Sequence, residues 1–253
     1  MATFNYRTII EMFRLSELIY SINSADAFVD GPNPDLEEHN IRYGYSSDSI
    51  ITFVSDDYTD VQYCISTNSV QKRTCVVFRG SNSFTDWMYN IQRAQTEIKN
   101  NICVHSGYLK ILFTDNIYHN IREQINTLIK QYPKNDIFIT GHSSGGAMAT
   151  LLGYFLSKDM PTKKINIVSF GSPRVGNYAF RFDFMSRPNL VHNRVVNRYD
   201  IVSVIPFFGY YHVGRKILIQ PRKLSCCRVF NPWAHLINGY FTSLMETTCP
   251  LGP

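Results

Sequence analysis

The segment Gly141-His142-Ser143-Ser144-Gly145 has the residue types and spacing of a reactive serine held in a tight turn. A short apolar run, Ile137 to Thr140, precedes it, and a helix rich in small residues is expected to follow. A sharp turn between a buried strand and a helix lifts a serine hydroxyl out at the end of a sheet, and the glycines let strand and helix approach closely. We therefore predict Ser143 as a nucleophile.

A serine hydroxyl needs a base to take its proton and a carboxylate to orient that base. Asp200 ends the run VVNRYD, 57 residues after Ser143, where the end of a strand can bring its carboxylate to the site. Asp183 falls within an expected helix and is more simply a solvated surface charge. In this type of fold the order along the chain is serine, acid, histidine. The base should therefore follow Asp200.

Only two histidines follow Asp200. His212 lies in the alternating run YYHVGRKILI, where a half-buried structural histidine is the simpler interpretation. His235 follows the helix-start signal Asn231-Pro232, from which a ring can point across the sheet edge, so we predict His235 as the base. The apolar face of that last helix is expected to contain Trp233, Leu236, Ile237, Tyr240, Phe241 and Leu244.

Negative charge on a tetrahedral intermediate must be held by fixed hydrogen-bond donors. We expect the backbone N–H of Ser144 to be one donor, aided by the positive end of its helix. The second is expected after the strand that ends in the run VVFRGS, where Ser81 has both an N–H and a hydroxyl. A serine that caps a helix is an equally simple interpretation of Ser81. His142 and His105 are expected to be structural.

Helical and strand patterns alternate along the chain, which predicts a mostly parallel sheet. The length of 253 residues fits one domain spanning 1–253, and no internal repeat or linker is visible. The helices are expected near residues 9–19, 109–132, 147–156 and 178–185, and the strands at 61–66, 73–78, 137–140, 165–170 and 191–197.

The net charge of +5 comes from Lys and Arg scattered along the chain, without a basic run or a basic and aromatic motif. This argues against a nucleic-acid partner. The best candidate for a membrane span, Ile201 to Tyr211, is short and contains Pro206 and Gly209, so no transmembrane segment is expected.

No secretory signal is visible at the N-terminus, so we expect an intracellular protein. The six cysteines show no metal-ligand spacing, and reduced thiols are expected. One disulfide between Cys64 and Cys75, facing each other across a hairpin, is the alternative for an exported protein.

A series of motifs runs in order from Val76 to Tyr240: VVFRGSNSFTDW, VHSGY, ITGHSSGGAMATL, SFGSPRVGN, NRYDIV, YYHVG and HLINGY. This series resembles the class 3 lipases, which include fungal triacylglycerol lipases, plant phospholipase A1-like and diacylglycerol lipases, and feruloyl esterases. The resemblance implies an α/β-hydrolase fold, a mixed, mainly parallel sheet flanked by helices, with no metal or organic cofactor.

The same resemblance implies roles for individual residues: Ser143 as nucleophile, Asp200 as acid, His235 as base, and Ser81 and Ser144 in the oxyanion hole. Two positions depart from the family pattern. Ser144 replaces the usual leucine, and Asn90 stands where the family often has an aspartate that supports the oxyanion loop.

Three functions fit these residues. The first is a lipase or phospholipase that meets its lipid substrate at a membrane or droplet interface, the second an esterase for small or plant-wall esters, and the third a catalytically silent binding relative. The predicted triad argues against the third, and the family favours lipids. The kind of ester, whether triacylglycerol, diacylglycerol, phospholipid or small ester, stays open.

An amphipathic segment follows the predicted oxyanion serine. Four apolar residues fall at i, i+3, i+4 and i+7, which is one helical face: Phe84, Trp87, Met88 and Ile91. The resemblance implies a mobile lid here, because fungal lipases carry theirs in this part of the chain. A helix packed permanently on the core is the alternative.

Overall fold

The computed structural model describes residues 6–21, 49–56, 61–81, 94–220 and 234–246. Within them, seven strands form a central sheet in the order β1-β2-β3-β6-β7-β8-β9. The pairs from β3 through β9 are parallel, while β1, β2 and β3 are antiparallel. Strand bounds are β1 (Ser49–Asp56), β2 (Val61–Asn68), β3 (Arg73–Phe78), β6 (Asp136–His142), β7 (Ile165–Phe170), β8 (Leu190–Asn197) and β9 (Arg215–Ile219).

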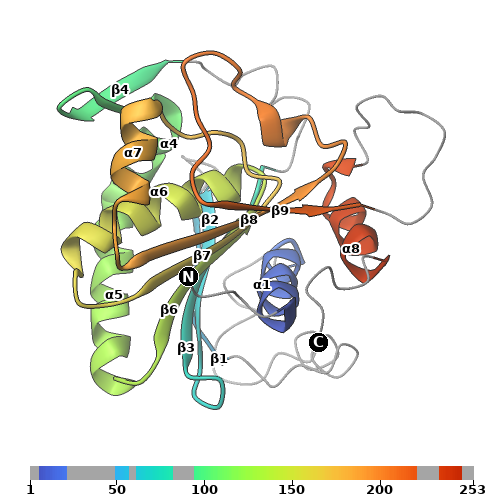
Figure 1. Cartoon of the computed structure of the whole chain (residues 1–253). Coiled ribbons are helices and arrows are strands. Elements are labelled where there is room, and N and C mark those ends of the chain that lie inside the picture. Colours follow the sequence, from blue (N-terminus) through green and yellow to red (C-terminus); the bar gives the residue numbers. More distant parts are fainter. Residues whose placement is uncertain (1–5, 22–48, 57–60, 82–93, 221–233, 247–253) are drawn as a thin grey trace.

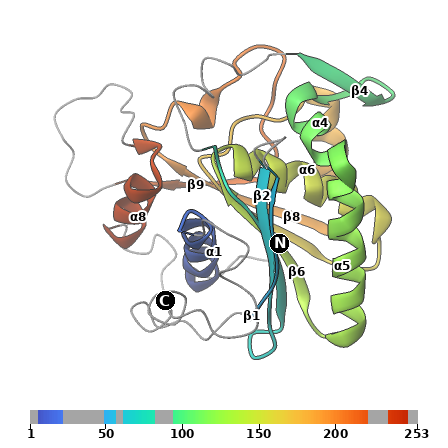
Figure 2. The same ribbon diagram turned by 180° about the vertical axis from the view of Figure 1, so that it is seen from behind.

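Helices cover both faces of this sheet (Figures 1 and 2). One face carries α1 (Tyr6–Leu18) and α8 (Ile237–Glu246), and the other carries α4 (Ser106–Phe113), α5 (Ile117–Gln131), α6 (Ser144–Asp159) and α7 (Tyr178–Met185). The prediction of an α/β-hydrolase fold with a mainly parallel sheet is confirmed.

The core has two parts because successive strand residues point to opposite faces. On β3, Val76 and Phe78 pack with the helices α4 to α7, whereas Cys75 and Val77 pack with α1 and α8. Every residue of β7 is buried, as expected for a strand covered on both sides. The site-bearing strands are thus fixed in the middle of the protein.

The chain from 109 to 132, expected as one helix, is divided in two. A short 3₁₀ turn, η2 (Thr114–Asn116), separates α4 from α5, with positive φ angles at Asp115 (48°) and Asn116 (59°). Asp and Asn tolerate this region better than other non-glycine residues. Apolar periodicity continues on both sides of the break, so the pattern alone did not reveal it.

Three strands were not predicted from the sequence: β1 at the sheet edge, and the separate hairpin of β4 (Gln95–Lys99) and β5 (Ile102–His105). Cys64 and Cys75 lie on neighbouring strands but do not face each other, because the register pairs Cys64 with Val77 and Cys75 with Ser66. Both are buried thiols. Within the described residues, no helix combines the length and apolar character of a membrane span.

Candidate active site

Ser143 lies in the turn between β6 and α6, with a φ of 57° and a ψ of −128°. For a residue other than glycine, a positive φ costs free energy. Such a conformation persists only where the surrounding structure enforces it. Here the N–H of Ser143 donates to the carbonyl oxygen of Phe170 at 2.8 Å. The turn also needs Gly145, since a Cβ there would lie 2.5 Å from the carbonyl oxygen of Phe78.

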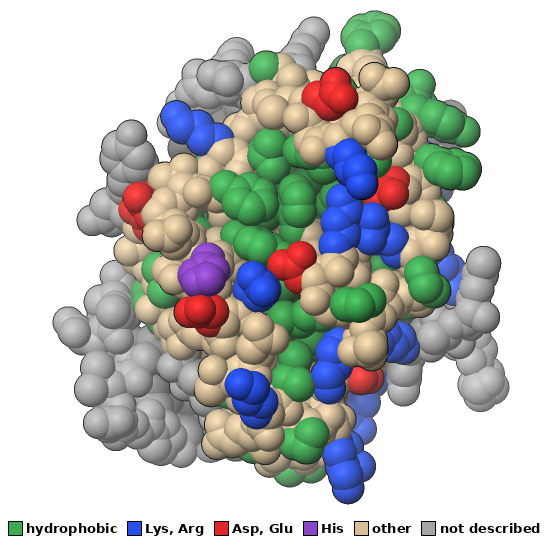
Figure 3. Space-filling model, turned by 90° about the vertical axis from the view of Figure 1, so that its left-hand side faces the viewer, with side chains coloured by type: hydrophobic (Ala, Val, Ile, Leu, Met, Phe, Trp, Pro, Cys, Tyr) green, Lys and Arg blue, Asp and Glu red, His purple; other side chains and the backbone are tan. Residues whose placement is uncertain are grey.

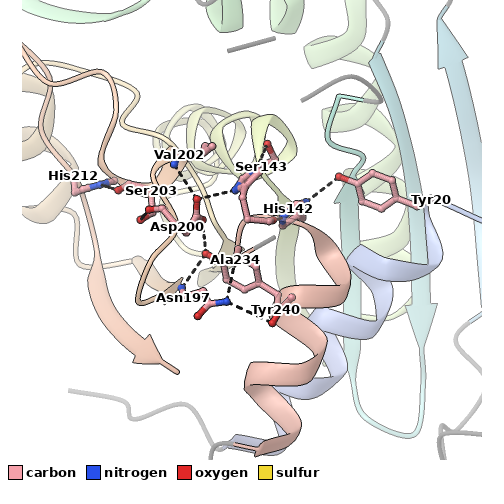
Figure 4. Close-up of polar contacts among 12 residues, drawn as sticks. Tyr20, His142, Ser143, Asn197, Asp200, Val202, Ser203, His212, Ala234 and Tyr240 are labelled. Atoms are coloured by element: carbon pink, nitrogen blue, oxygen red, sulfur yellow. Dashed lines mark hydrogen bonds and ion pairs between the residues drawn. The ribbon is translucent and has the colours of Figure 1, made fainter. Parts of the chain in front are cut away.

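The structure brings the three predicted triad residues into one hydrogen-bonded chain. Figure 4 labels two of them, Ser143 and Asp200, together with their neighbours. The distance from Ser143 Oγ to His235 Nε2 is 2.9 Å, and that from His235 Nδ1 to Asp200 Oδ1 is also 2.9 Å. All three side chains are buried. If Nδ1 carries the imidazole proton toward the carboxylate, Nε2 accepts the hydroxyl proton of Ser143.

Asp200 is fixed by two further donors. Its Oδ1 accepts from the backbone N–H of Val202 at 2.8 Å, and its Oδ2 accepts from the Tyr240 hydroxyl at 2.7 Å. The Tyr240 oxygen in turn accepts the backbone N–H of Asn197 at 3.0 Å. Burial, and then the charge of Asp200, raise the pKa of Tyr240 well above its ordinary value, so Tyr240 stays a donor.

The role of Tyr240 at the acid was not predicted, because the sequence pattern indicated only that it lies on the apolar face of the last helix. The ring is buried in the core, as expected, but the hydroxyl reaches the acid. A buried tyrosine usually finds a partner for its hydroxyl. This tendency was the one signal in the sequence for a polar role of Tyr240, but it does not identify the residue that accepts the hydrogen bond.

The other two histidines near the site have different partners. His212 Nε2 contacts the carbonyl oxygen of Ser203, and burial followed by the charge of Arg194 lowers the pKa of His212 to about 2. Its hydrogen bond is therefore to backbone and not to Ser143. This agrees with the structural role expected for it.

His142 packs against the base, His235, and hydrogen-bonds to its backbone. Its Nε2 lies 2.7 Å from the carbonyl oxygen of His235, its Nδ1 lies 3.0 Å from the Tyr20 hydroxyl, and its ring stacks on that of His235. Burial, and then His235, lower the pKa of His142 well below its ordinary value, so the ring is neutral. Because a carbonyl can only accept, Nε2 carries the proton and Nδ1 accepts from Tyr20. The contribution of Tyr20, which lies in the turn that follows α1, was not predicted.

The two predicted oxyanion residues also meet. The N–H of Ser81 donates to Ser144 Oγ at 2.9 Å, and the two hydroxyl oxygens are 3.0 Å apart. Gly80 permits this approach, since a Cβ there would lie 2.3 Å from the Tyr20 hydroxyl and 3.2 Å from Ser143 Cβ. The Ser144 hydroxyl thus occupies the N–H of Ser81 and contacts its hydroxyl.

Several predicted positions lie outside the described residues. These include Asn90 and all four lid candidates, so the lid and the possible helix cap at Ser81 stay predictions. Among the residues that the structure does describe, no group of His, Cys, Asp or Glu side chains could hold a metal ion.

Residues 75–210 match the family model described as Lipase (class 3). The chain belongs to the class 3 lipase family. Over 176 residues the chain is 31% identical to a lipase of Rhizopus niveus, covering 65% of this chain and 43% of the relative.

Two further relatives carry more specific names. A secreted mono- and diacylglycerol lipase of Fusarium solani is 29% identical, covering 73% of this chain and 53% of the relative. A chloroplastic phospholipase A(1) of Arabidopsis thaliana is 24% identical, covering 69% and 50%. The chain therefore spans about half the length of the curated relatives it matches.

Solved structures share its fold. A triacylglycerol lipase whose catalytic centre is a serine protease triad gives a TM-score of 0.74 at 23% identity, covering 97% of this chain and 94% of the other. Lipase II of Rhizopus niveus gives 0.70 at 23% identity, covering 96% and 94%. A triacylglycerol lipase of Penicillium expansum gives 0.70 at 18% identity, covering 100% and 92%.

Proposed function

We propose that this chain hydrolyses carboxylic esters of lipids through an acyl-enzyme, with Ser143, His235 and Asp200 as its triad. The observation that carries the proposal is the hydrogen-bonded chain from Ser143 Oγ through His235 to Asp200, with 2.9 Å at each step. Membership of the class 3 lipase family supports it. So does the serine protease triad of the triacylglycerol lipase that shares the fold.

In the first half of the reaction Ser143 Oγ attacks the ester carbonyl carbon while its proton passes to His235 Nε2. The tetrahedral intermediate collapses, and His235 returns the proton to the leaving alcohol. In the second half a water molecule attacks the acyl carbon while its proton passes to His235 Nε2. The second intermediate then collapses to the free acid as His235 returns that proton to Ser143 Oγ. Asp200 orients the ring and offsets its transient positive charge.

The oxyanion of each intermediate needs donors at about 2.7–3.1 Å. We assign these to the N–H of Ser144 and to the N–H and hydroxyl of Ser81. In the structure Ser144 Oγ lies at such distances, 2.9 and 3.0 Å, from the nitrogen and hydroxyl oxygen of Ser81. It therefore stands in for an oxyanion and has to turn away when the substrate oxygen arrives.

Lipid esters are the substrate class that the relatives favour, since their names include lipase, mono- and diacylglycerol lipase and phospholipase A(1). A panel of short dissolved esters, feruloyl esters, long-chain acylglycerols and phospholipids tests this choice. We expect the highest rates on long-chain lipids. A preference for short or feruloyl esters would replace the lipase function with an esterase function, and no hydrolysis would favour a silent relative.

The nucleophile is tested by labelling with a fluorophosphonate. Ser143→Ala should abolish both labelling and turnover while leaving the melting temperature within a few degrees, because only the activated hydroxyl is lost. His235→Ala should lower kcat by several orders of magnitude, and His212→Ala should act mainly through stability. Labelling at another serine, or the reverse order of the two histidines, would refute the assignment.

A further inference from the structure

Helix α7 presents an apolar face to solvent. Tyr178, Phe182 and Met185, at i, i+4 and i+7, are 63%, 71% and 56% exposed. The opposite side of the same helix is anchored in the core by Phe180 and Phe184. The helix therefore packs well by one side and still carries three large apolar side chains on the other.

The loop that precedes β9 adds three more side chains to this face. Phe207, Phe208 and Tyr211 are 54%, 84% and 45% exposed. The rings of Tyr211 and Tyr178 are in edge contact, with centroids 5.4 Å apart, so loop and helix form one surface. Six of the eleven exposed large hydrophobic residues in the described part of the chain belong to it. We call this surface the docking face: Tyr178, Phe182, Met185, Phe207, Phe208 and Tyr211.

The backbone of the loop is held in place while its rings face outward. Arg174 Nη1 donates to the carbonyl oxygens of Pro206 at 2.9 Å and Phe207 at 3.3 Å. Gln95 Nε2 donates to the carbonyl oxygen of Gly209 at 2.8 Å. A fixed, clustered apolar surface of this kind is typical of an interaction site, whereas single exposed apolar residues are ordinary.

The charges around the docking face have one dominant sign. The two segments that form it, 174–187 and 201–220, contain five Lys and Arg residues and one acid, Asp183, which is paired with Arg187 at 2.6 Å. Arg215 and Lys216 are exposed at the start of β9. Figure 3 shows the side of the molecule where α7 lies, with hydrophobic side chains at its upper right edge and several Lys and Arg below them, among which single Asp or Glu side chains also stand.

The loop that carries half of the docking face begins at the catalytic acid, where the N–H of Val202 and the hydroxyl of Ser203 donate to Asp200. The loop leaves the site directly after Asp200, and the N–H of Arg174 ties it back at 2.8 Å to the carbonyl oxygen of Ile205. Aromatic side chains beside basic ones match an anionic lipid surface, in which rings enter the headgroup region and cations meet phosphates. We propose that the docking face binds an anionic phospholipid surface and holds the active site beside it; this rests on the proposed lipid substrate.

The proposal is tested by co-sedimentation of the full chain, carrying Ser143→Ala, with phosphatidylcholine vesicles that contain or lack phosphatidylglycerol. We expect binding only to the anionic vesicles and its loss with added salt. Phe182→Ser with Phe208→Ser should raise the lipid concentration for half-binding roughly tenfold or more. Arg215→Gln with Lys216→Gln should also raise the lipid concentration for half-binding, by about fivefold for each charge removed.

Matched controls are Val70→Ser, which removes a side chain that is 80% exposed elsewhere, and Lys130→Gln, which removes an exposed charge on α5. Both should bind like the parent. Equal binding by the docking-face variants and the controls, or equal binding to neutral and anionic vesicles, would overturn the proposal. A dimer without lipid that dissociates on Phe182→Ser would assign the face to a second copy instead.

In the enzyme with Ser143 intact, Phe182→Ser should keep its rate on a dissolved short ester. Failure of the lipid-hydrolase proposal would appear as no turnover of any lipid and leaves vesicle binding unchanged. Failure of the docking proposal would appear as unchanged vesicle binding in the variants, whatever the turnover. The two outcomes are therefore distinguishable.

Discussion

Replacing Ser144 with alanine is expected to make the enzyme faster. In the structure the Ser144 hydroxyl accepts the N–H of Ser81 at 2.9 Å and lies 3.0 Å from its hydroxyl. Both groups of Ser81 are donors that we assign to the oxyanion. Before they can hold a substrate oxygen, the Ser144 side chain has to release them.

The size of the effect follows from these two contacts. A hydrogen bond between neutral groups contributes about 0.5–1.5 kcal/mol net, so two contribute about 1–3 kcal/mol. The two contacts between Ser81 and Ser144 are only partly buried, and water compensates part of the loss when Ser144 turns away. We therefore expect Ser144→Ala to lower the activation free energy by about 1–2 kcal/mol, which corresponds to a rise of about 5- to 30-fold in kcat/KM.

The assay is hydrolysis of a dissolved short ester, together with the rate of fluorophosphonate labelling. Ser144→Ala and Ser144→Leu should both gain in kcat/KM, while Ser144→Thr, which retains the hydroxyl, should stay near the parent. A fall in kcat/KM for the alanine variant would refute the reasoning. It would show that the hydroxyl positions Ser81 and does not occupy its donors.

Four further outcomes are expected. Tyr240→Phe removes a 2.7 Å hydrogen bond to Asp200. We expect this to raise the activation free energy by about 1–2 kcal/mol, seen as a roughly tenfold fall in kcat in steady-state assays. Gly171→Ala should be more damaging in the same assay, because the added Cβ would lie 2.8 Å from Asp200 Oδ2 at a φ of +58°. Burial lowers the pKa of His192 to about 3, so the free energy of unfolding is at its full value above about pH 6.5 and falls as the pH drops toward 3. In urea unfolding, His192→Gln should reduce this dependence of the unfolding free energy on pH by up to about 1.4 kcal/mol per pH unit. Trp87→Ser should lower activity on emulsified long-chain substrate more than on a dissolved ester, and equal losses would argue against a lid.

The sequence was most informative where function depends on local pattern. The turn around Ser143, the strand before Asp200 and the helix start near His235 each have short-range signals, and the expected chain order links them. The structure brings these three residues within hydrogen-bonding distance. The alternation of helix and strand patterns was sufficient to predict the mainly parallel sheet.

The supporting contacts were not accessible in this way. Tyr20 reaches His142 across 122 positions and Tyr240 reaches Asp200 across 40, and periodicity identifies a buried face without naming its partner. The side-chain orientation of Ser144 likewise depends on the approach of a loop from another strand. Such contacts are set by tertiary packing, which a local pattern does not encode.

The contact between α1 and α8 has a consequence for how activity arises during synthesis. Tyr6 donates to the carbonyl oxygen of Leu244, and Arg14 Nη2 lies 3.9 Å from Met245 Sδ, so the last described helix docks on the first. His235 lies just before α8, 92 positions after Ser143. A ribosome releases the serine and its acid well before this histidine, and domains fold as their segments emerge. The growing chain would hold an unactivated hydroxyl until α8 packs on α1, so catalytic competence and the docking of these two helices would arise together.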